Sequence, residues 1–266
     1  MSQGNIGADV KNLVRILGAH SYGKADVVVR ELLQNGRDAI HSRFRGESGS
    51  RGRIDVTALR SSITFIDNGT GMKRGELEEY LSKLGTTIKQ AENAGSTGND
   101  PIGEFGIGFF SAFMIADRII VRTRKPDEGK AFEWNSVGST SYEITELQDP
   151  IEPGTQVTII LQPGSNRFAD VAELRRIIQQ YCDFMDCKVF LAGSPEPVNV
   201  GSFAWEVRGH AEQQRWVGRY FGEPPIAFTL GLASANEPVS FQFLLSCRNS
   251  GQPRHAIYSK RLFVIV

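Results

Sequence analysis

The chain has 266 residues, 40% of them hydrophobic, and its 30 basic and 30 acidic side chains cancel to a formal charge of zero. This length and apolar content predict one large or two smaller domains with a packed core. The neutral total gives no electrostatic reason to expect nucleic acid or an anionic membrane as a partner.

The cysteines Cys182, Cys187 and Cys247 match neither a disulfide framework nor paired metal-ligand spacing. We interpret them as buried thiols in a reducing compartment. The N-terminus lacks a charged segment followed by an apolar run, and no window approaches 18 uninterrupted apolar residues. The sequence therefore predicts a soluble cytoplasmic protein.

The first part of the chain predicts helices and a hairpin. Apolar side chains at helical spacing predict helices over residues 9–18, about 24–43, and 73–85. Between the last two helices, residues 53–60 and 62–67 alternate apolar and polar side chains, which predicts a β-hairpin.

The glycine-rich stretch 84–108 is small and polar, so we predict a mobile loop there. The apolar segment FFSAFMIAD, residues 109–117, predicts a helix. The elements expected after it are strands over 118–124, 131–137, 141–147 and 154–161, an amphipathic helix over 168–184 and a strand over 188–193.

Prolines and small residues over 193–201 are typical of a linker. We predict a first domain over 1–192, a linker over 193–215, and the start of a second domain, cut short, over 216–266. Strands are expected over 239–247 and 256–266. The aromatic residues at 203–207 and 215–221 form either a binding stripe or packing between the domains, and we favour packing.

Three polar residues of the second helix recur at one interval. On a helical wheel, Glu31, Asn35 and Asp38 fall within about 60° of one another. They border a wide apolar arc, where a side chain can face a cleft. Such a stripe is either a solvated surface or the lining of a site, and this helix alone leaves both possibilities open.

Two glycine-rich segments are candidates for a ligand-binding site. FIDNGTGM, residues 65–72, ends a strand in Asp67, whose carboxylate can accept hydrogen bonds from a buried ligand amine, while Gly69 and Gly71 permit close approach. A simple β-turn is the alternative. GEFGIG, residues 103–108, precedes an apolar helix, where exposed N–H groups favour phosphate. Its spacing matches neither a Walker loop nor a dinucleotide fingerprint.

Four motifs in order, ELLQNGRDA, DNGTGM, LGTTIK and IGEFGIGFFSAFMIAD, resemble the N-terminal ATPase domain of the 90-kDa heat-shock chaperones, of which HtpG is the bacterial version. The resemblance covers about residues 8–192. That family belongs to the superfamily of gyrase, chaperone, histidine-kinase and mismatch-repair ATPases. The resemblance implies an α/β fold, a two-layer sandwich whose mixed β-sheet backs helices. The tail IYSKRLFVIV is similar to a strand of the chaperone's middle domain, so the start of a second α/β domain is expected.

The resemblance also implies a site for ATP or ADP with Mg²⁺ between the helices and the sheet. Glu31 would be the general base, Asn35 would coordinate Mg²⁺, and Asp67 would bind the adenine amino group. The other implied nucleotide contacts are Asp38, Gly71, Met72 and Thr155 around the base and ribose, and Lys89, Gly106, Ile107, Gly108 and Phe109 near the phosphates. Residues 84–108 would form the lid.

Three positions depart from the family's usual pattern. Ser42 stands where a lysine is common, Lys83 replaces an asparagine and Glu104 replaces a glutamine. The first two border the ribose and phosphate end, so they bear on affinity and on lid contacts. Glu104 would weaken phosphate binding if it pointed inward, and we expect it to point outward.

The implied function is an ATP-hydrolysing chaperone module. Lid closure would drive dimerisation of the full-length protein and remodelling of client proteins, while the fragment itself can be monomeric. Turnover should be slow, because the family completes its site with an arginine of the middle domain that lies beyond this chain.

Three alternatives belong to other classes. A nucleotide-gated switch would bind ATP or ADP with little hydrolysis, and the presence of Glu31 argues against it. A DNA-directed relative of the gyrase or mismatch-repair type is disfavoured by the neutral charge and by the form of the glycine loop. A histidine kinase would need a phosphoacceptor helix pair upstream, for which the chain has no room.

Overall fold

The computed structural model describes residues 2–5, 25–45, 51–81, 108–139, 141–149, 151–203, 205–221, 225–234, 240–247, 257–259 and 262–265. The helix predicted over 9–18 and nearly all of the loop predicted over 84–108 lie outside these ranges.

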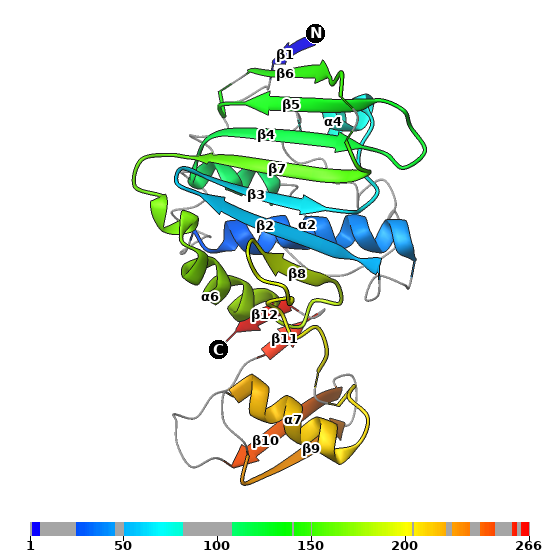
Figure 1. Cartoon of the computed structure of the whole chain (residues 1–266), viewed down its shortest axis with the longest axis vertical. Helices are drawn as coiled ribbons and strands as arrows, with labels where there is room; N and C mark the ends of the chain where they lie inside the picture. Colours follow the sequence, from blue (N-terminus) through cyan, green and yellow to red (C-terminus); the bar gives the residue numbers. More distant parts are fainter. Residues whose placement is uncertain are drawn as a thin grey trace.

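One layer of the fold is an eight-stranded sheet with the order β1-β6-β5-β4-β7-β3-β2-β8 (Figure 1). Its strands are β1 (Ser2–Asn5), β2 (Arg53–Leu59), β3 (Ser62–Asp67), β4 (Ala116–Arg124), β5 (Ala131–Ser136), β6 (Ser141–Glu146), β7 (Gly154–Leu161) and β8 (Lys188–Leu191). The β2 and β8 pair is parallel and the other pairs are antiparallel, so the sheet is mixed.

Helices form the second layer, on one face of the sheet (Figure 1). They are α2 (Val27–Phe44), α4 (Arg74–Tyr80), the 3₁₀ helices η1 (Phe109–Met114) and η2 (Asn166–Ala169), and α6 (Val171–Cys182). Helix α2 contacts β2, β3, η1 and α6. A mixed sheet backed by helices confirms the predicted two-layer α/β fold.

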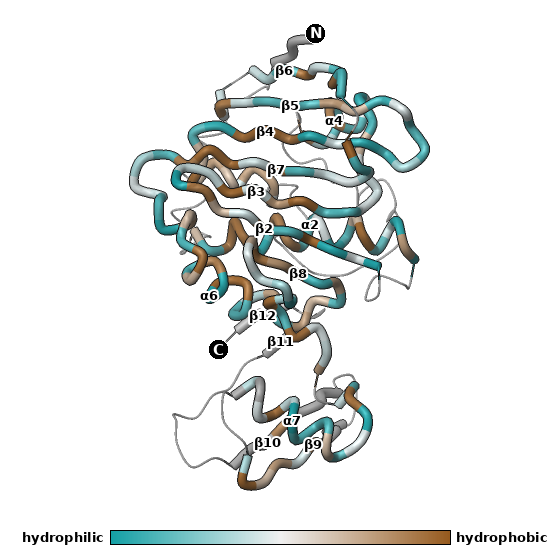
Figure 2. The backbone as a smooth tube through the Cα atoms, viewed as in Figure 1, coloured by the Kyte–Doolittle hydropathy of each residue, from teal (hydrophilic) through white to brown (hydrophobic). Residues whose placement is uncertain are grey.

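The hydrophobic core lies between α2 and the sheet. Leu33 and Ile40 of α2 are fully buried, as are Ile54 of β2 and Ile63 of β3. Burying a side chain of this size contributes roughly 1.5–3 kcal/mol. Figure 2 shows these apolar stretches along α2, α6 and the central strands. The apolar arc predicted for α2 is therefore what fixes this helix on the sheet.

Gly36 is buried in the middle of α2. A Cβ atom at this position would lie 3.1 Å from Cδ1 of Ile54 and 3.3 Å from Cβ of Asp67. The glycine therefore brings the helix close to the end of β3. Its lower helix propensity, about 1 kcal/mol relative to alanine, is offset by this packing.

The helix predicted over 109–117 is present, but it is a 3₁₀ helix and it ends three residues earlier than predicted. Residues Phe109–Met114 form a 3₁₀ helix, in which the Ile115 N–H donates to the Ala112 carbonyl. From Ala116 the chain is already in β4, where this residue pairs with Leu161 of β7. Pairing with a distant strand therefore ends the helix earlier than the local apolar pattern predicts.

The last part of the chain also differs in detail from the prediction. Helix α7 (His210–Phe221) begins inside the predicted linker, and β9 (Ala227–Ser234) pairs with β10 (Ser240–Cys247). The strand predicted over 256–266 is instead an antiparallel pair, β11 (Ile257–Ser259) and β12 (Leu262–Ile265).

Aromatic side chains join the region around α7 to the end of α6. The ring of Phe184, just after α6, stacks on Phe203 at 4.3 Å and on Trp216 at 5.9 Å. Trp216 in turn stacks on Tyr220 at 5.0 Å, and its Nε1–H donates to the Ser202 carbonyl. These aromatic residues therefore pack against one another.

Two inferences from composition concern the thiols and the membrane. Cys182 and Cys187 are buried and free, as predicted, and burial raises the pKa of the Cys187 thiol to about 12. In the part of the chain that the structure describes, no helix combines the length and apolar character needed to cross a bilayer.

Asn199 fastens the segment after β8 to the fold. Its side chain is 3% exposed, accepts from the Val189 N–H at 2.9 Å, and donates to the Cys187 and Met185 carbonyls. Asn199→Ala would leave these buried backbone groups without partners, so it should lower the free energy of unfolding by about 2–4 kcal/mol. Urea denaturation would measure this loss. The partly exposed Asn135 of β5 provides the control, since Asn135→Ala should change stability much less.

Candidate functional site

Three polar residues form a row across the middle of the sheet. Asp67 on β3 pairs with Thr155 on β7, and Thr155 pairs with Thr123 on β4. Residues directly opposite on neighbouring strands point to the same face. Phe65, two positions before Asp67, is buried in the core, so the row lies on the face covered by helices.

The Asp67 carboxyl group lies in an enclosed and partly hydrogen-bonded environment. Burial raises its pKa to about 7, although backbone N–H groups of Gly69 and Thr155 and the charge of Arg43 oppose the shift. The Gly69 N–H donates to Oδ1 at 2.8 Å. The group therefore ionises less readily than an ordinary aspartate, and an additional donor at this position would favour its charged form.

Two glycines allow the backbone to close around Asp67. Gly71 has a φ of 60°, and a Cβ atom there would lie 2.0 Å from the Arg124 carbonyl oxygen. Gly154 has a φ of 137°, and its added Cβ would lie 2.0 Å from the Asp67 carbonyl oxygen. Side chains at these positions would force the strand ends apart, so the compact wall of the site requires glycine.

The Thr123 hydroxyl links the backbone segments on either side of the site. Thr123 is fully buried, and its Oγ1 accepts from the Met72 N–H at 2.8 Å and donates to the Gly154 carbonyl at 2.9 Å. The Thr155 Oγ1 lies 3.2 Å from it. Met72, partly buried, packs against the core. The predicted base-binding residues Asp67, Gly71, Met72 and Thr155 therefore lie together.

The three residues of the polar stripe of α2 differ in exposure. The Glu31 side chain is buried, and its Oε1 accepts from Nη2 of Arg30 at 2.7 Å and from Nε at 3.2 Å. Asn35 is exposed and Asp38 partly exposed, with Oδ1 of Asp38 3.4 Å from Nη1 of Arg37. The stripe therefore runs from a covered carboxylate to an open amide along the helix.

The end of the glycine-rich loop meets Glu31. A Cβ atom on Gly108 would lie 2.7 Å from Glu31 Oε2, so the loop backbone passes directly over the carboxylate. Ser111 Oγ donates to the Gly108 carbonyl at 2.6 Å, and Phe109 contacts the Trp134 ring edge-on at 5.7 Å. Glu31, Gly108 and Phe109 therefore lie together at η1.

The remaining predicted site residues lie outside the described residues. These are Lys89, Gly106 and Ile107, together with the unusual positions Lys83 and Glu104. Ser42, the third departure from the family pattern, is exposed on α2.

Two residues near the site were missed by sequence reasoning. Thr123 follows Ile119 and Val121 at alternating positions of β4, so a polar residue at a buried position was a detectable signal. Arg43 holds the turn after β3, because its Nη1 donates to the Asn68 carbonyl at 2.7 Å and to the Pro153 carbonyl at 3.2 Å. Nothing in the local sequence pointed to that role.

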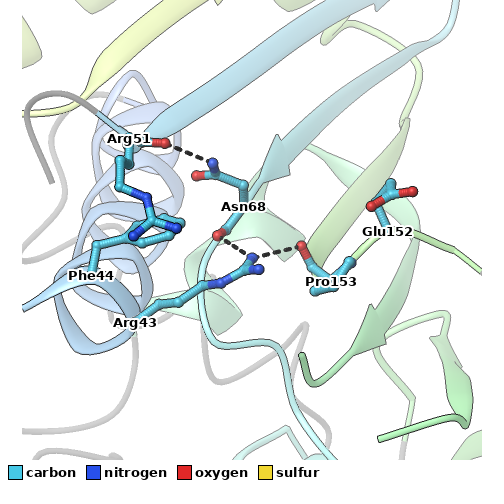
Figure 3. A pocket seen from close by; sticks show the side chains of 6 residues that line it. All are labelled: Arg43, Phe44, Arg51, Asn68, Glu152 and Pro153. Carbon is cyan, nitrogen blue, oxygen red and sulfur yellow. Dashed lines mark hydrogen bonds between the residues drawn. The ribbon is translucent and has the colours of Figure 1, made fainter. Parts of the chain in front are cut away.

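An open pocket of about 490 Å³ lies beside this turn (Figure 3). Figure 3 shows Arg43 reaching the Asn68 and Pro153 carbonyls while the Asn68 side chain donates to the Arg51 carbonyl. Its lining residues are Arg43, Phe44, Arg51, Asn68, Glu152 and Pro153. None of the predicted nucleotide-binding residues belongs to this set.

Residues 23–158, about half of the chain, match the family described as "Histidine kinase-, DNA gyrase B-, and HSP90-like ATPase". The chaperone protein HtpG of Rhodopseudomonas palustris (strain BisB5) is 29% identical over 75% of this chain and 35% of its own length. HtpG of Sodalis glossinidius (strain morsitans) is 36% identical over 66% of this chain and 31% of its own.

The mitochondrial 75-kDa heat shock protein of Bos taurus is 34% identical over 70% of this chain and 28% of its own length. The chain thus spans about a third of the length of these curated relatives. The family match over residues 23–158 includes α2 and the row of polar residues described above. The chain therefore belongs to the histidine kinase-, DNA gyrase B- and HSP90-like ATPase family, within its 90-kDa heat-shock chaperone branch.

Proposed function

We propose that this chain is the ATP-binding module of a chaperone, and that it binds adenine nucleotide against β3 and β7 and hydrolyses ATP slowly. The observation that carries the proposal is the Asp67 carboxyl group, which lies beside Thr155 at a strand end where Gly71 and Gly154 let the neighbouring backbone segments pack closely. An enclosed acceptor of this kind suits the amino group of a base.

Each predicted residue has a specific role in this proposal. Asp67 accepts a hydrogen bond from the adenine amino group, Met72 packs on the base, and Thr155 contributes its hydroxyl. Asp38 borders the ribose, and the backbone at Gly108 approaches the phosphates. Support comes from the proximity of α2 to the Asp67 strand end, seen in the 3.3 Å between an added Gly36 Cβ and the Asp67 Cβ.

The residues present are compatible with Mg²⁺. No cluster of three or more histidine, cysteine, aspartate or glutamate side chains suited to a metal exists among the described residues. Mg²⁺ does not need such a cluster, since it commonly takes one or two protein oxygens and completes its shell with water and substrate phosphates. The exposed amide of Asn35, one turn from Glu31, is a suitable oxygen donor. When bound, Mg²⁺ would neutralise phosphate charge.

Glu31 is the proposed general base, which takes a proton from the attacking water. In the full-length protein we propose that lid closure is coupled to dimerisation and to remodelling of client proteins, with a cytoplasmic location. These features rest on family analogy, because the chain spans about a third of its relatives.

Titration calorimetry with ADP, ATP and GTP, each with and without Mg²⁺, tests the proposal. We expect ADP and ATP to bind at one site, with the Mg²⁺ effect larger for ATP, and GTP to bind far more weakly. If neither ADP nor ATP gives a measurable heat of binding, with or without Mg²⁺, the proposal is contradicted.

A nucleotide-gated switch with little hydrolysis is the second candidate. The observation in its favour is that Glu31 is 4% exposed, engaged by Arg30 on one oxygen and covered near the other by Gly108. A base held in this way must be released before it can reach water. The Glu31 variant described in the Discussion distinguishes the two functions.

A further inference from the structure

We propose that Thr123 is a positioning residue that sets base specificity: it fixes the Thr155 hydroxyl as a hydrogen-bond acceptor, so that the site selects a purine with an amino group at position 6. This inference rests on the proposed function, since it concerns how the same site distinguishes bases. Thr123 itself is fully buried and touches no ligand in this account.

The Thr123 hydroxyl has a fixed number of hydrogen-bonding positions. A threonine hydroxyl has one hydrogen to donate and two lone pairs. The Gly154 carbonyl, 2.9 Å away, can only accept, so it takes the Thr123 hydrogen. The Met72 N–H, 2.8 Å away, can only donate, so it occupies one Thr123 lone pair.

The remaining contact of Thr123 is then determined. Its Oγ1 lies 3.2 Å from the Thr155 Oγ1, and either oxygen could donate if this pair stood alone. Because the Thr123 hydrogen is already committed to Gly154, the Thr155 hydroxyl must be the donor. The Thr155 hydrogen therefore points toward β4, and its lone pairs are left for other partners.

The orientation of the Thr155 hydroxyl determines which hydrogen-bonding groups face the base. Thr155 is the direct cross-strand partner of Asp67, whose carboxylate, in the ionised form present at pH 8, also only accepts. The two neighbouring groups together present acceptors alone. An exocyclic amino group carries two hydrogens and satisfies both acceptors, directly or through a water, whereas a 6-oxo group satisfies neither and the N1–H of a 6-oxo purine supplies only one hydrogen.

The test compares the binding of ADP with that of IDP, in which a 6-oxo group replaces the 6-amino group. The proteins compared are wild type, Thr123→Val, Thr123→Ser and Thr155→Val. Affinities would be measured by displacement of a fluorescent ADP analogue. Valine keeps the shape of Thr123 but removes the hydroxyl, so the Thr155 hydroxyl can rotate and donate to the 6-oxo group. We expect the preference for ADP over IDP to fall about threefold to tenfold in Thr123→Val, the effect of one hydrogen bond.

Two further variants separate positioning from a general structural effect. Thr123→Ser retains the hydroxyl and should restore the wild-type preference. In a Thr155→Val background, Thr123→Val should change the preference no further, because Thr123 acts through Thr155. If Thr123→Val fails to fold, as judged by circular dichroism, the single Thr155→Val variant still tests the idea, since it alone should reduce the preference.

The outcomes distinguish this inference from the proposed function. Wild-type protein that binds no adenine nucleotide contradicts the proposed function itself. Wild-type protein that binds ADP and IDP equally well, or a Thr155→Val variant with unchanged preference, overturns the role of the threonine pair while leaving nucleotide binding intact. Equal loss of preference in Thr123→Ser and Thr123→Val would also overturn it.

Discussion

Replacing Asp67 with asparagine is expected to weaken ADP binding by about 10²-fold and, at pH 8, to stabilise the protein without ligand. Binding weakens because a charged acceptor, whose hydrogen bond contributes about 1.5–3 kcal/mol, is replaced by a neutral amide that accepts more weakly. Stability increases because burial disfavours the carboxylate, as its raised pKa shows, and the neutral amide avoids that cost. Function and stability should therefore change in opposite directions at this position.

The sign of the pH dependence follows from the pKa of Asp67, which rises from an ordinary value of 3.8 to about 7 on folding. Between these pH values the folded protein holds a proton that the unfolded chain has released. The free energy of unfolding should therefore fall as pH rises from about 4 to about 7, by on the order of 3–4 kcal/mol from this group. Asp67→Asn lacks this titration, so its stability should vary less across the same window.

Binding should show the opposite trend in wild-type protein. The amino group of adenine donates to the ionised carboxylate, so ADP affinity should be steady above about pH 7 and fall by about tenfold per pH unit below it. Calorimetry with ADP and urea denaturation, each at pH 5 and pH 8, would measure both trends.

Asp55→Asn is the matched control for Asp67→Asn. Asp55 lies on the adjacent strand β2 and forms an exposed ion pair with Arg53. Its neutralisation should change stability by less than about 1 kcal/mol and leave ADP affinity unaltered. An Asp67→Asn variant that binds ADP as tightly as wild type would contradict the assignment of Asp67 to the base.

Features set by local periodicity were predictable from the sequence. The 3.6-residue pattern of apolar side chains placed α2 within a few residues of its observed ends, and it put Glu31 beside the buried face. The alternation over 53–67 likewise predicted the β2 and β3 hairpin that ends at Asp67. In both cases the sequence pattern and the element that it predicts involve residues close together in the chain, so the element could be predicted from the local sequence.

Features set by distant contacts were not predictable in this way. The end of η1 depends on where Ala116 joins β7, about 45 residues further along the chain. The role of Thr123 depends on the β4 and β7 register, which brings it opposite Thr155. A single sequence contains no direct record of strand register, so the hydroxyl network could only be recognised in three dimensions.

Glu31→Gln is expected to reduce ATP hydrolysis by about 10² to 10⁴ while ADP and ATP affinities stay within about threefold of wild type. A glutamine keeps the size of the side chain but cannot accept the proton of the attacking water, and loss of a general base typically costs this much. The side chain packs between Arg30 and Gly108, so a substitution of equal size should preserve the fold there.

Slow turnover calls for a single-turnover measurement, with enzyme in excess over radiolabelled ATP, and binding should be followed separately by calorimetry. Glu212→Gln is the control, because Glu212 is an exposed glutamate of α7 paired with Arg215. That variant should hydrolyse ATP at the wild-type rate. Any rate loss shared by both variants would come from preparation rather than from the site.

The comparison of wild type with Glu31→Gln also decides between the two proposed functions. Hydrolysis that depends on Glu31 means that its carboxylate reaches the attacking water during the reaction, although its Oε1 is engaged by Arg30 in this structure. An unchanged residual rate, with ATP still bound, means that the carboxylate stays in its ion pair. The module would then act as a nucleotide-gated switch, in which occupancy of the site beside Asp67 is itself the signal.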